Sequence, residues 1–155
     1  KLVKIQAATI AKALSDIDPA GAEEYAKNLA EFNADLDRID AKLSDVLSPI
    51  QGQEFFVFHP AYGYFADAYG LKQVPVEIGG KEPSAKQLAR LIDKAKKAGV
   101  RVIFVQPQFS NKSAAVLAQA IGGTVVSLDP LPRDYLKNLE DMAAKLEQGI
   151  KVHQN

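Results

Sequence analysis

Short apolar runs alternate with longer amphipathic segments over the last two thirds of the chain, and this alternation constrains the fold more than any other feature. Runs rich in β-branched and aromatic residues, such as Val102-Ile103-Phe104-Val105, are typical of buried strands. Parallel strands need a crossover between them, so strands that alternate with helices of about 10–15 residues predict β-α-β units. We therefore expect an α/β fold with a four-stranded, mostly parallel sheet flanked by helices. The expected strands cover residues 54–58, 73–76, 100–105 and 124–128.

One expected helix is much longer than the others. Asp18 is a suitable N-cap for it, and Pro19 suits the first helical position, where its missing N–H costs nothing. Apolar residues then repeat at steps of three and four as far as Ser48-Pro49. A helix of about 29 residues would be about 43 Å long, which suits a coiled-coil arm or a strut between two lobes. The apolar positions are Ala22, Tyr25, Leu29, Phe32, Leu36, Ile39, Leu43 and Leu47.

These patterns divide the chain into two parts. Residues 1–50 hold a first helix (1–15) and the long connecting helix, and residues 51–155 form the α/β lobe. The chain starts within a helical pattern and without an initiator methionine, so we interpret it as a fragment. Within the α/β lobe, helices are expected after His59-Pro60, from Ser84 to Ala98, over 111–121 and over about 133–150.

Composition excludes several classes of function. There is no cysteine, so disulfides, thiolate metal sites and cysteine nucleophiles are excluded. The 19 basic and 19 acidic residues balance, which gives no reason to expect a nucleic-acid partner. Neither the GxSxG elbow of serine hydrolases nor the GxxxxGK[ST] phosphate loop occurs. Enzymatic function therefore has no positive support from motifs.

Polar residues follow three of the expected strands. His59-Pro60, Gln106-Pro107-Gln108 and Asp129-Pro130 come where strands end, and an open parallel sheet binds ligands at that edge. His59 and Asp129 are ordinary metal ligands. Each also has a simpler interpretation, since a histidine after a strand is often a loop residue and an aspartate before proline is often a turn residue. Two ligands would also be too few, because zinc takes three or four protein ligands.

Aromatic residues cluster just after His59. They could line a pocket, but their helical spacing favours a place in the core. They are Tyr62, Tyr64, Phe65 and Tyr69.

Five segments together resemble one known family. They match, in order, the C-terminal lobe of zinc- and manganese-binding solute-binding proteins of ABC importers (the ZnuA-like group, cluster A-I). Asp18-Pro19 with Tyr25 and Asn28 resembles the start of that family's rigid interlobe helix. The resemblance covers nearly the whole chain, and the other segments are 58–71, Glu82-Pro83-Ser84 with Leu88, 102–109 and 124–131.

The resemblance implies a metal site that this chain can only half supply. His59 would give an imidazole and Asp129 a carboxylate, and the remaining ligands would come from the N-terminal lobe. Zinc is expected rather than manganese, because imidazole suits zinc better. A polar partner should fix the tautomer of His59, and we expect Gln106 or the Tyr62 hydroxyl near the site.

The same resemblance implies the protein's place and partners. It implies an extracytoplasmic protein, periplasmic or lipid-anchored in a Gram-positive cell, that delivers its ion to an ABC permease. The fragment could self-associate through surface that a missing lobe would cover. Two alternatives stay open. One is a hydrolase-like or flavodoxin-like enzyme that uses the same strand edge, and the other is a structural or adhesive domain that dimerises through the long helix.

Overall fold

The computed structural model describes residues 1–108 and 112–151 of the chain. The chain divides into two compact units, Lys1–Lys42 and a second that starts at Leu43. Residues 109–111, which include the expected helix start at Asn111, lie outside the described part. The helices are α1 (Leu2–Ile17), α2 (Ala22–Leu47), α3 (Gly63–Ala68), α4 (Ala85–Lys97), α5 (Lys112–Ala120) and α6 (Tyr135–Lys151). The strands are β1 (Glu54–Val57), β2 (Lys72–Pro75), β3 (Val102–Val105) and β4 (Thr124–Ser127).

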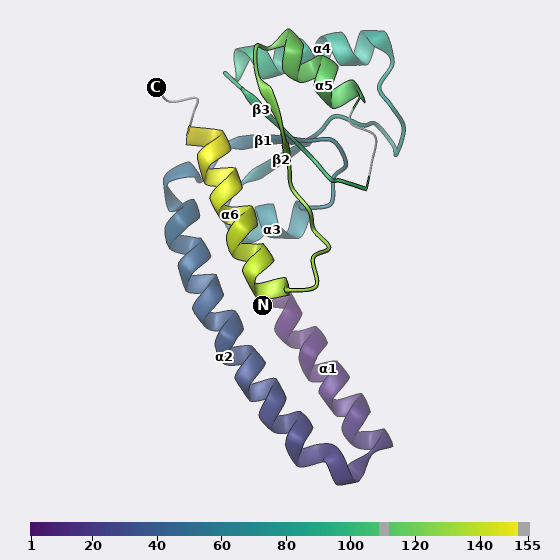
Figure 1. Ribbon diagram of the computed structural model, residues 1–155, viewed down its shortest axis with the longest axis vertical. Coiled ribbons are helices and arrows are strands. Elements are labelled where there is room, and N and C mark those ends of the chain that lie inside the picture. Colours follow the sequence, from purple (N-terminus) through teal and green to yellow (C-terminus); the bar gives the residue numbers. More distant parts are fainter. Residues whose placement is uncertain (109–111, 152–155) are drawn as a thin grey trace. The chain divides into compact units, whose positions relative to one another are not determined.

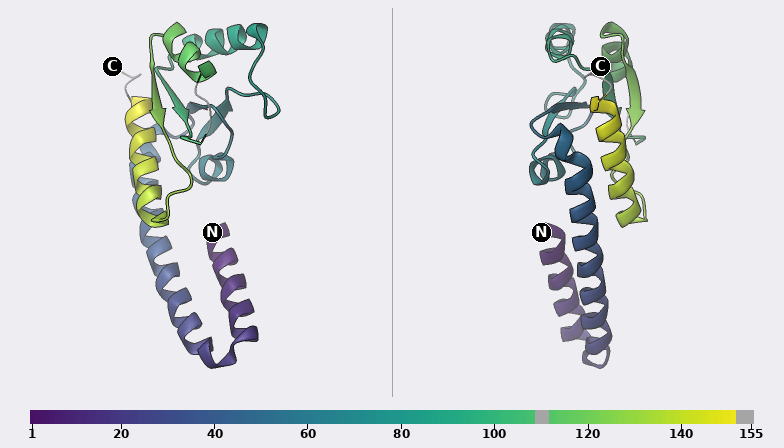
Figure 2. Two further views of the ribbon diagram at one scale, coloured as in Figure 1. Left: turned by 45° about the vertical axis from the view of Figure 1, so that its right-hand side comes forward. Right: turned by 90° about the vertical axis from the view of Figure 1, so that its left-hand side faces the viewer.

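The first unit is a helical hairpin in which α1 runs alongside the first part of α2 (Figure 2). An ion pair between Lys4 and Asp37 joins the two helices. The predicted N-cap role of Asp18 is wrong, because a 3-10 turn over Pro19–Gly21 comes first and the Asp18 side chain makes no capping bond. Its Oδ2 instead accepts a hydrogen bond of 2.8 Å from the Tyr25 hydroxyl. The long helix therefore begins at Ala22 and has 26 residues.

The second unit contains a four-stranded sheet in the order β2-β1-β3-β4 (Figure 1). All three strand pairings are parallel, which confirms the predicted α/β fold. Strand β2 lies at an edge, as expected from Pro75, which has no N–H to donate to a neighbour. Helices α4 and α5 lie on one face of the sheet, and α3 and α6 lie on the other (Figures 1 and 2).

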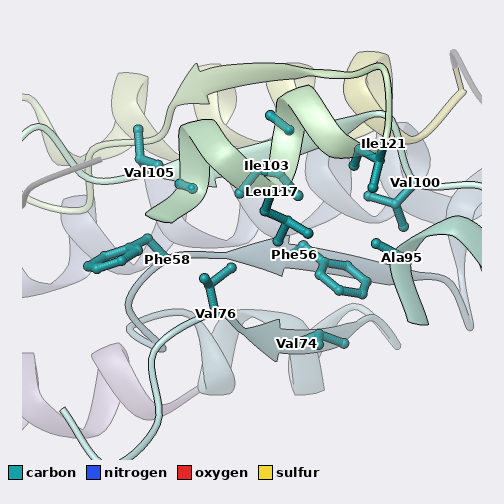
Figure 3. Packing of buried hydrophobic residues seen from close by; sticks show 12 residues of the cluster. Phe56, Phe58, Val74, Val76, Ala95, Val100, Ile103, Val105, Leu117 and Ile121 are labelled. Atoms are coloured by element: carbon teal, nitrogen blue, oxygen red, sulfur yellow. The ribbon is translucent and has the colours of Figure 1, made fainter. Parts of the chain in front are cut away.

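Alternate residues of each strand fill the core on the α4 and α5 face. Figure 3 shows Phe56 of β1, Ile103 of β3 and Leu117 of α5 meeting there. Phe56 and Ile103 are paired in register, so their side chains point to the same face. Both are fully buried, which makes this register costly to change. The other buried members of this cluster are Phe58, Val74, Val76, Ala95, Val100, Val105, Ala114, Ala118 and Ile121.

Helix α6 packs against the opposite face of the sheet. Phe55 and Phe104 meet edge to face there, with ring centroids 6.3 Å apart. A Cβ placed on Gly149 would lie 2.8 Å from Cζ of Phe104, so glycine lets α6 approach the sheet. Within the described residues, no helix combines the length and apolar character that crossing a bilayer requires.

The aromatic group after His59 only partly joins the core. Tyr62 is 3% exposed, but Tyr64 is 82% exposed, so the expectation that Tyr64 belongs to the core is wrong. The reason is the length of α3, whose six residues can bury only one narrow face. Phe65 and Tyr69 are half-buried and contact each other, with ring centroids 5.0 Å apart.

Other helix boundaries follow from local chemistry. Ser84 caps α4 as predicted, and with Gln87 it forms a capping box. Gly99 follows α4 with a φ of 68°, a conformation that glycine adopts without strain.

The tightest backbone approach gives a test of the fold. A Cβ at Gly123 would lie 2.1 Å from the carbonyl oxygen of Arg101, which also accepts a hydrogen bond from the Thr124 N–H. We expect Gly123→Ala to lower the free energy of unfolding by roughly 1–3 kcal/mol, because β4 must move away from β3. Urea unfolding at equilibrium measures the effect.

Gly63→Ala is the matched control, since a Cβ there meets nothing closer than 3.6 Å. It should change the free energy of unfolding by less than about 1 kcal/mol. Equal stability of the Gly123→Ala variant and the unaltered protein would contradict the close approach of Gly123 to the Arg101 carbonyl.

Candidate metal site

The carboxyl ends of the four parallel strands meet at one edge of the sheet. His59 lies two residues beyond the end of β1, and Asp129 lies two residues beyond the end of β4. Strand β3 runs between them, so their backbones are two strand spacings apart, about 10 Å. The structure thus brings both residues to the same edge, as the sequence predicted. Whether they bind one ion stays a prediction.

Backbone pairing continues past the strand ends and aligns the residues at this edge. The register pairs Val57 with both Pro75 and Phe104, and extending it by two residues sets His59 beside Glu77 and Gln106. Two hydrogen bonds support the extension: Glu77 N to Phe58 O at 3.1 Å and Phe58 N to Phe104 O at 2.8 Å. The bond from Leu128 N to Val105 O, at 2.8 Å, continues the pairing of β3 with β4 in the same way.

His59 is held by a buried acid that the sequence analysis missed. Its Nδ1 lies 2.7 Å from Oε1 of Glu77. Glu77 is 8% exposed, whereas the His59 side chain is 36% exposed and so reaches the surface of the edge. A carboxylate at Nδ1 favours the tautomer with its proton there, which leaves the lone pair on Nε2. The only signal for Glu77 in the sequence is its place two residues after β2, matching that of His59 after β1.

Asp129 is fixed by a turn and by a neighbouring amide. Its Oδ1 accepts hydrogen bonds from Nε2 of Gln108 at 2.8 Å and from the backbone N–H of Leu131 at 3.0 Å. Asp129 therefore does stabilise a turn, as the simpler interpretation of the sequence expected. Both bonds use the same oxygen, and within the described part of the chain Oδ2 accepts none. Asp129 can accordingly serve the turn through one oxygen and offer the other to a ligand.

Tyr62 joins the segment after β1 to the end of β4. Its hydroxyl donates a hydrogen bond to the backbone carbonyl of Leu128, the residue before Asp129. Its backbone N–H donates to Oε1 of Gln73 at 2.8 Å, which fixes the start of α3. Burial, and secondarily the negative charge of Asp129, raise the pKa of the Tyr62 hydroxyl well above its usual value. The hydroxyl therefore stays protonated and keeps its donor role.

Gln106 is buried at the end of β3, between the strands that carry His59 and Asp129. Its side chain is 2% exposed. In the part of the chain that the structure describes, its Oε1 has no hydrogen-bond partner. Both polar residues expected near the site, Tyr62 and Gln106, thus lie at this edge.

The residues at the edge fit part of a zinc site. Imidazole and carboxylate are suitable zinc ligands, and the Glu77–His59 pair is the usual support for a metal-binding histidine. Among residues 1–108 and 112–151, however, no group of three or more histidine, aspartate or glutamate side chains could hold an ion. A tetrahedral shell would need further ligands from outside this set.

Comparison with known proteins relates the chain to zinc-uptake components. It is 33% identical over 149 residues to the high-affinity zinc uptake system protein ZnuA of Brucella abortus (strain 2308), covering 95% of this chain and 44% of that protein. It is 39% identical over 116 residues to the ZnuA protein of Bacillus subtilis (strain 168), covering 74% of this chain and 36% of that protein. The chain thus spans less than half the length of these curated relatives.

Solved structures agree with this relationship. A crystal structure of ZnuA matches with a TM-score of 0.94 and 44% identity, covering 96% of this chain and 58% of that one. A ZnuA deletion mutant with zinc bound matches with a TM-score of 0.89 and 45% identity, covering 96% of this chain and 57% of that one. The family model of the periplasmic zinc-uptake complex component A matches residues 1–149. The chain therefore belongs to the ZnuA family of periplasmic zinc-uptake components.

Proposed function

We propose that this chain is the C-terminal metal-binding half of an extracytoplasmic protein that captures zinc and delivers it to an ABC importer. The observation that carries the proposal is the 2.7 Å contact between His59 Nδ1 and buried Glu77, at the same sheet edge as Asp129. Two relatives are named as high-affinity zinc uptake proteins, and one solved relative contains zinc, which supports zinc as the cargo.

The proposed mechanism is capture and release, with no chemistry performed on the ion. Glu77 holds the imidazole of His59 so that Nε2 faces the ion, and Asp129 adds a carboxylate oxygen. An N-terminal lobe in the full-length protein supplies the other ligands and closes the coordination shell. Residues 1–50 then act as the connection between lobes and residues 51–155 as the metal-binding lobe. Zinc is favoured over manganese because this half-site includes an imidazole.

The family places such components in the periplasm, and we propose the same extracytoplasmic location here, with a lipid anchor if the source is Gram-positive. The partner is then the permease of the importer. Self-association of the isolated chain is favoured by the exposed apolar residues of α1. In the full-length protein, the N-terminal lobe would cover such residues. They are Leu2, Ile5, Ile10, Leu14 and Ile17. The matched family is a solute-binding family, so no observation favours the enzyme alternative.

Removing the imidazole tests the ligand assignment. In the full-length protein that contains this chain, His59→Ala should weaken zinc binding by roughly 100-fold or more, about 3 kcal/mol. Competition with a chromophoric chelator measures the affinity. His153→Ala, which removes the other histidine of the sequence, should leave affinity unchanged. Equal affinities of His59→Ala and the unaltered protein would exclude His59 as a ligand.

Changing the acid behind the imidazole tests how His59 is held. Glu77→Gln keeps the size of the side chain but removes its charge, so the imidazole becomes a weaker ligand and less well oriented. We expect zinc affinity to fall by roughly tenfold. Glu31→Gln, at a side chain that is 66% exposed on α2, is the control and should have no effect. An unchanged affinity in Glu77→Gln would show that the contact is only structural.

Removing one hydroxyl tests the connection between the two ligand segments. Tyr62→Phe keeps the buried ring but leaves the Leu128 carbonyl without its donor. The free energy of unfolding should fall by roughly 1–3 kcal/mol. Zinc affinity should fall several-fold, because Asp129 is held less well.

The cobalt-loaded protein separates the two effects, since its visible spectrum reports ligand geometry. The spectrum should change in Tyr62→Phe and not in the control Tyr64→Phe, whose side chain is exposed. A Tyr62→Phe protein that loses stability but keeps its affinity and spectrum would limit Tyr62 to a role in folding.

A further inference from the structure

Gln106 is in an unusual position for a buried polar residue. It is the first residue after β3, and all four residues of that strand are buried. The extended register sets it beside His59 on one side and beside Leu128, the residue before Asp129, on the other. Gln106 thus ends the strand that lies between the two strands followed by the proposed ligands.

Keeping an amide at this position costs stability. Gln106 is 2% exposed, and its Oε1 has no hydrogen-bond partner among the described residues. A buried polar atom without a partner has lost its bonds to water and gained none. An apolar side chain of the same length would avoid that cost. Such a group calls for an explanation, and a ligand or ordered water that completes its bonding is a common one.

We propose that Gln106 is a positioning residue of the loaded site. Its Oε1 accepts a hydrogen bond from a donor that arrives with the ion, either the N–H of a ligand imidazole or a water bound to the ion. This inference rests on the proposed function. A bound cation makes N–H and O–H groups stronger donors, so the acceptor gains most when zinc is present. In the tautomer that Glu77 favours, His59 donates its Nδ1 proton to that carboxylate, so Gln106 serves a different group.

A second buried polar atom without a hydrogen-bond partner provides a comparison. Asn33 Oδ1, on α2 in the first unit, is the other buried side-chain atom in the described residues that lacks a partner. Asn33 lies within a helix and does not follow a strand. Both atoms lack a hydrogen-bond partner, but only Gln106 follows a strand that ends at the candidate site. Comparing the two therefore separates the stability cost of a missing partner from a role in zinc binding.

The experiment measures stability and affinity together in the full-length protein. Gln106→Met replaces the amide with an apolar side chain of similar length. The melting temperature of the zinc-free Gln106→Met protein, measured in EDTA, should rise by about 2 °C, because the desolvated amide is gone. Zinc affinity, measured by chelator competition, should fall by about tenfold, because the loaded site loses its acceptor. Asn33→Leu should raise the melting temperature similarly and leave zinc affinity unchanged.

Gln106→Glu is the rescue variant. It keeps an acceptor of the same length, so zinc affinity should stay at or above that of the unaltered protein. The zinc-free form should melt lower, because a carboxylate is costlier to bury than an amide.

Three results would overturn the proposal. The Gln106→Met protein could bind zinc within twofold of the unaltered protein, or it could lose stability and zinc affinity together. The third is a loss of zinc affinity in Gln106→Met that is also found in Gln106→Glu. Failure of the proposed function itself is distinguishable, because His59→Ala would then also bind zinc normally.

Discussion

The parallel register of the four strands is the constraint on which the candidate site depends. Phe56 and Ile103 are paired and fully buried on one face, so the strands cannot slip by one residue without exposing them. Side chains alternate, and the same register sets Phe55 and Phe104 against α6 on the other face. The apolar residues inside the sheet therefore also decide which polar residues meet at its end. Shifting β2 by one residue would move Glu77 to the opposite face from His59.

Hydrogen bonding then turns this coarse alignment into defined side-chain positions. Glu77 orients His59, Gln108 and the local turn orient Asp129, and Tyr62 ties the segment after β1 to the residue before Asp129. Apart from the local turn, each contact joins segments that follow different strands. In a network of this kind the value of one bond depends on the others.

The sequence predicted the parts of this arrangement that periodicity controls. Alternating strands and helices predicted the sheet, and parallel strand ends placed His59 and Asp129 at one edge. It could not reveal Glu77, because that pairing depends on the register of β1 with β2, which only packing fixes. The place of Tyr64 was wrong because helical spacing does not tell how long α3 is. The sequence predicted Asp18 as the N-cap of the long helix, but a 3-10 turn follows it, and its carboxylate accepts a hydrogen bond from the Tyr25 hydroxyl instead.

The proposed division of the site between two lobes has a physical advantage for a transport protein. This half orders its two candidate ligands before any ion arrives, since Glu77 and Gln108 already hold them. Less conformational entropy is then lost on binding, which favours high affinity once the shell is complete. Two ligands alone, however, cannot satisfy zinc. In the proposed two-lobed protein, an affinity that requires both halves would be lost when they separate, so a small opening movement would release the ion without chemical change in either half.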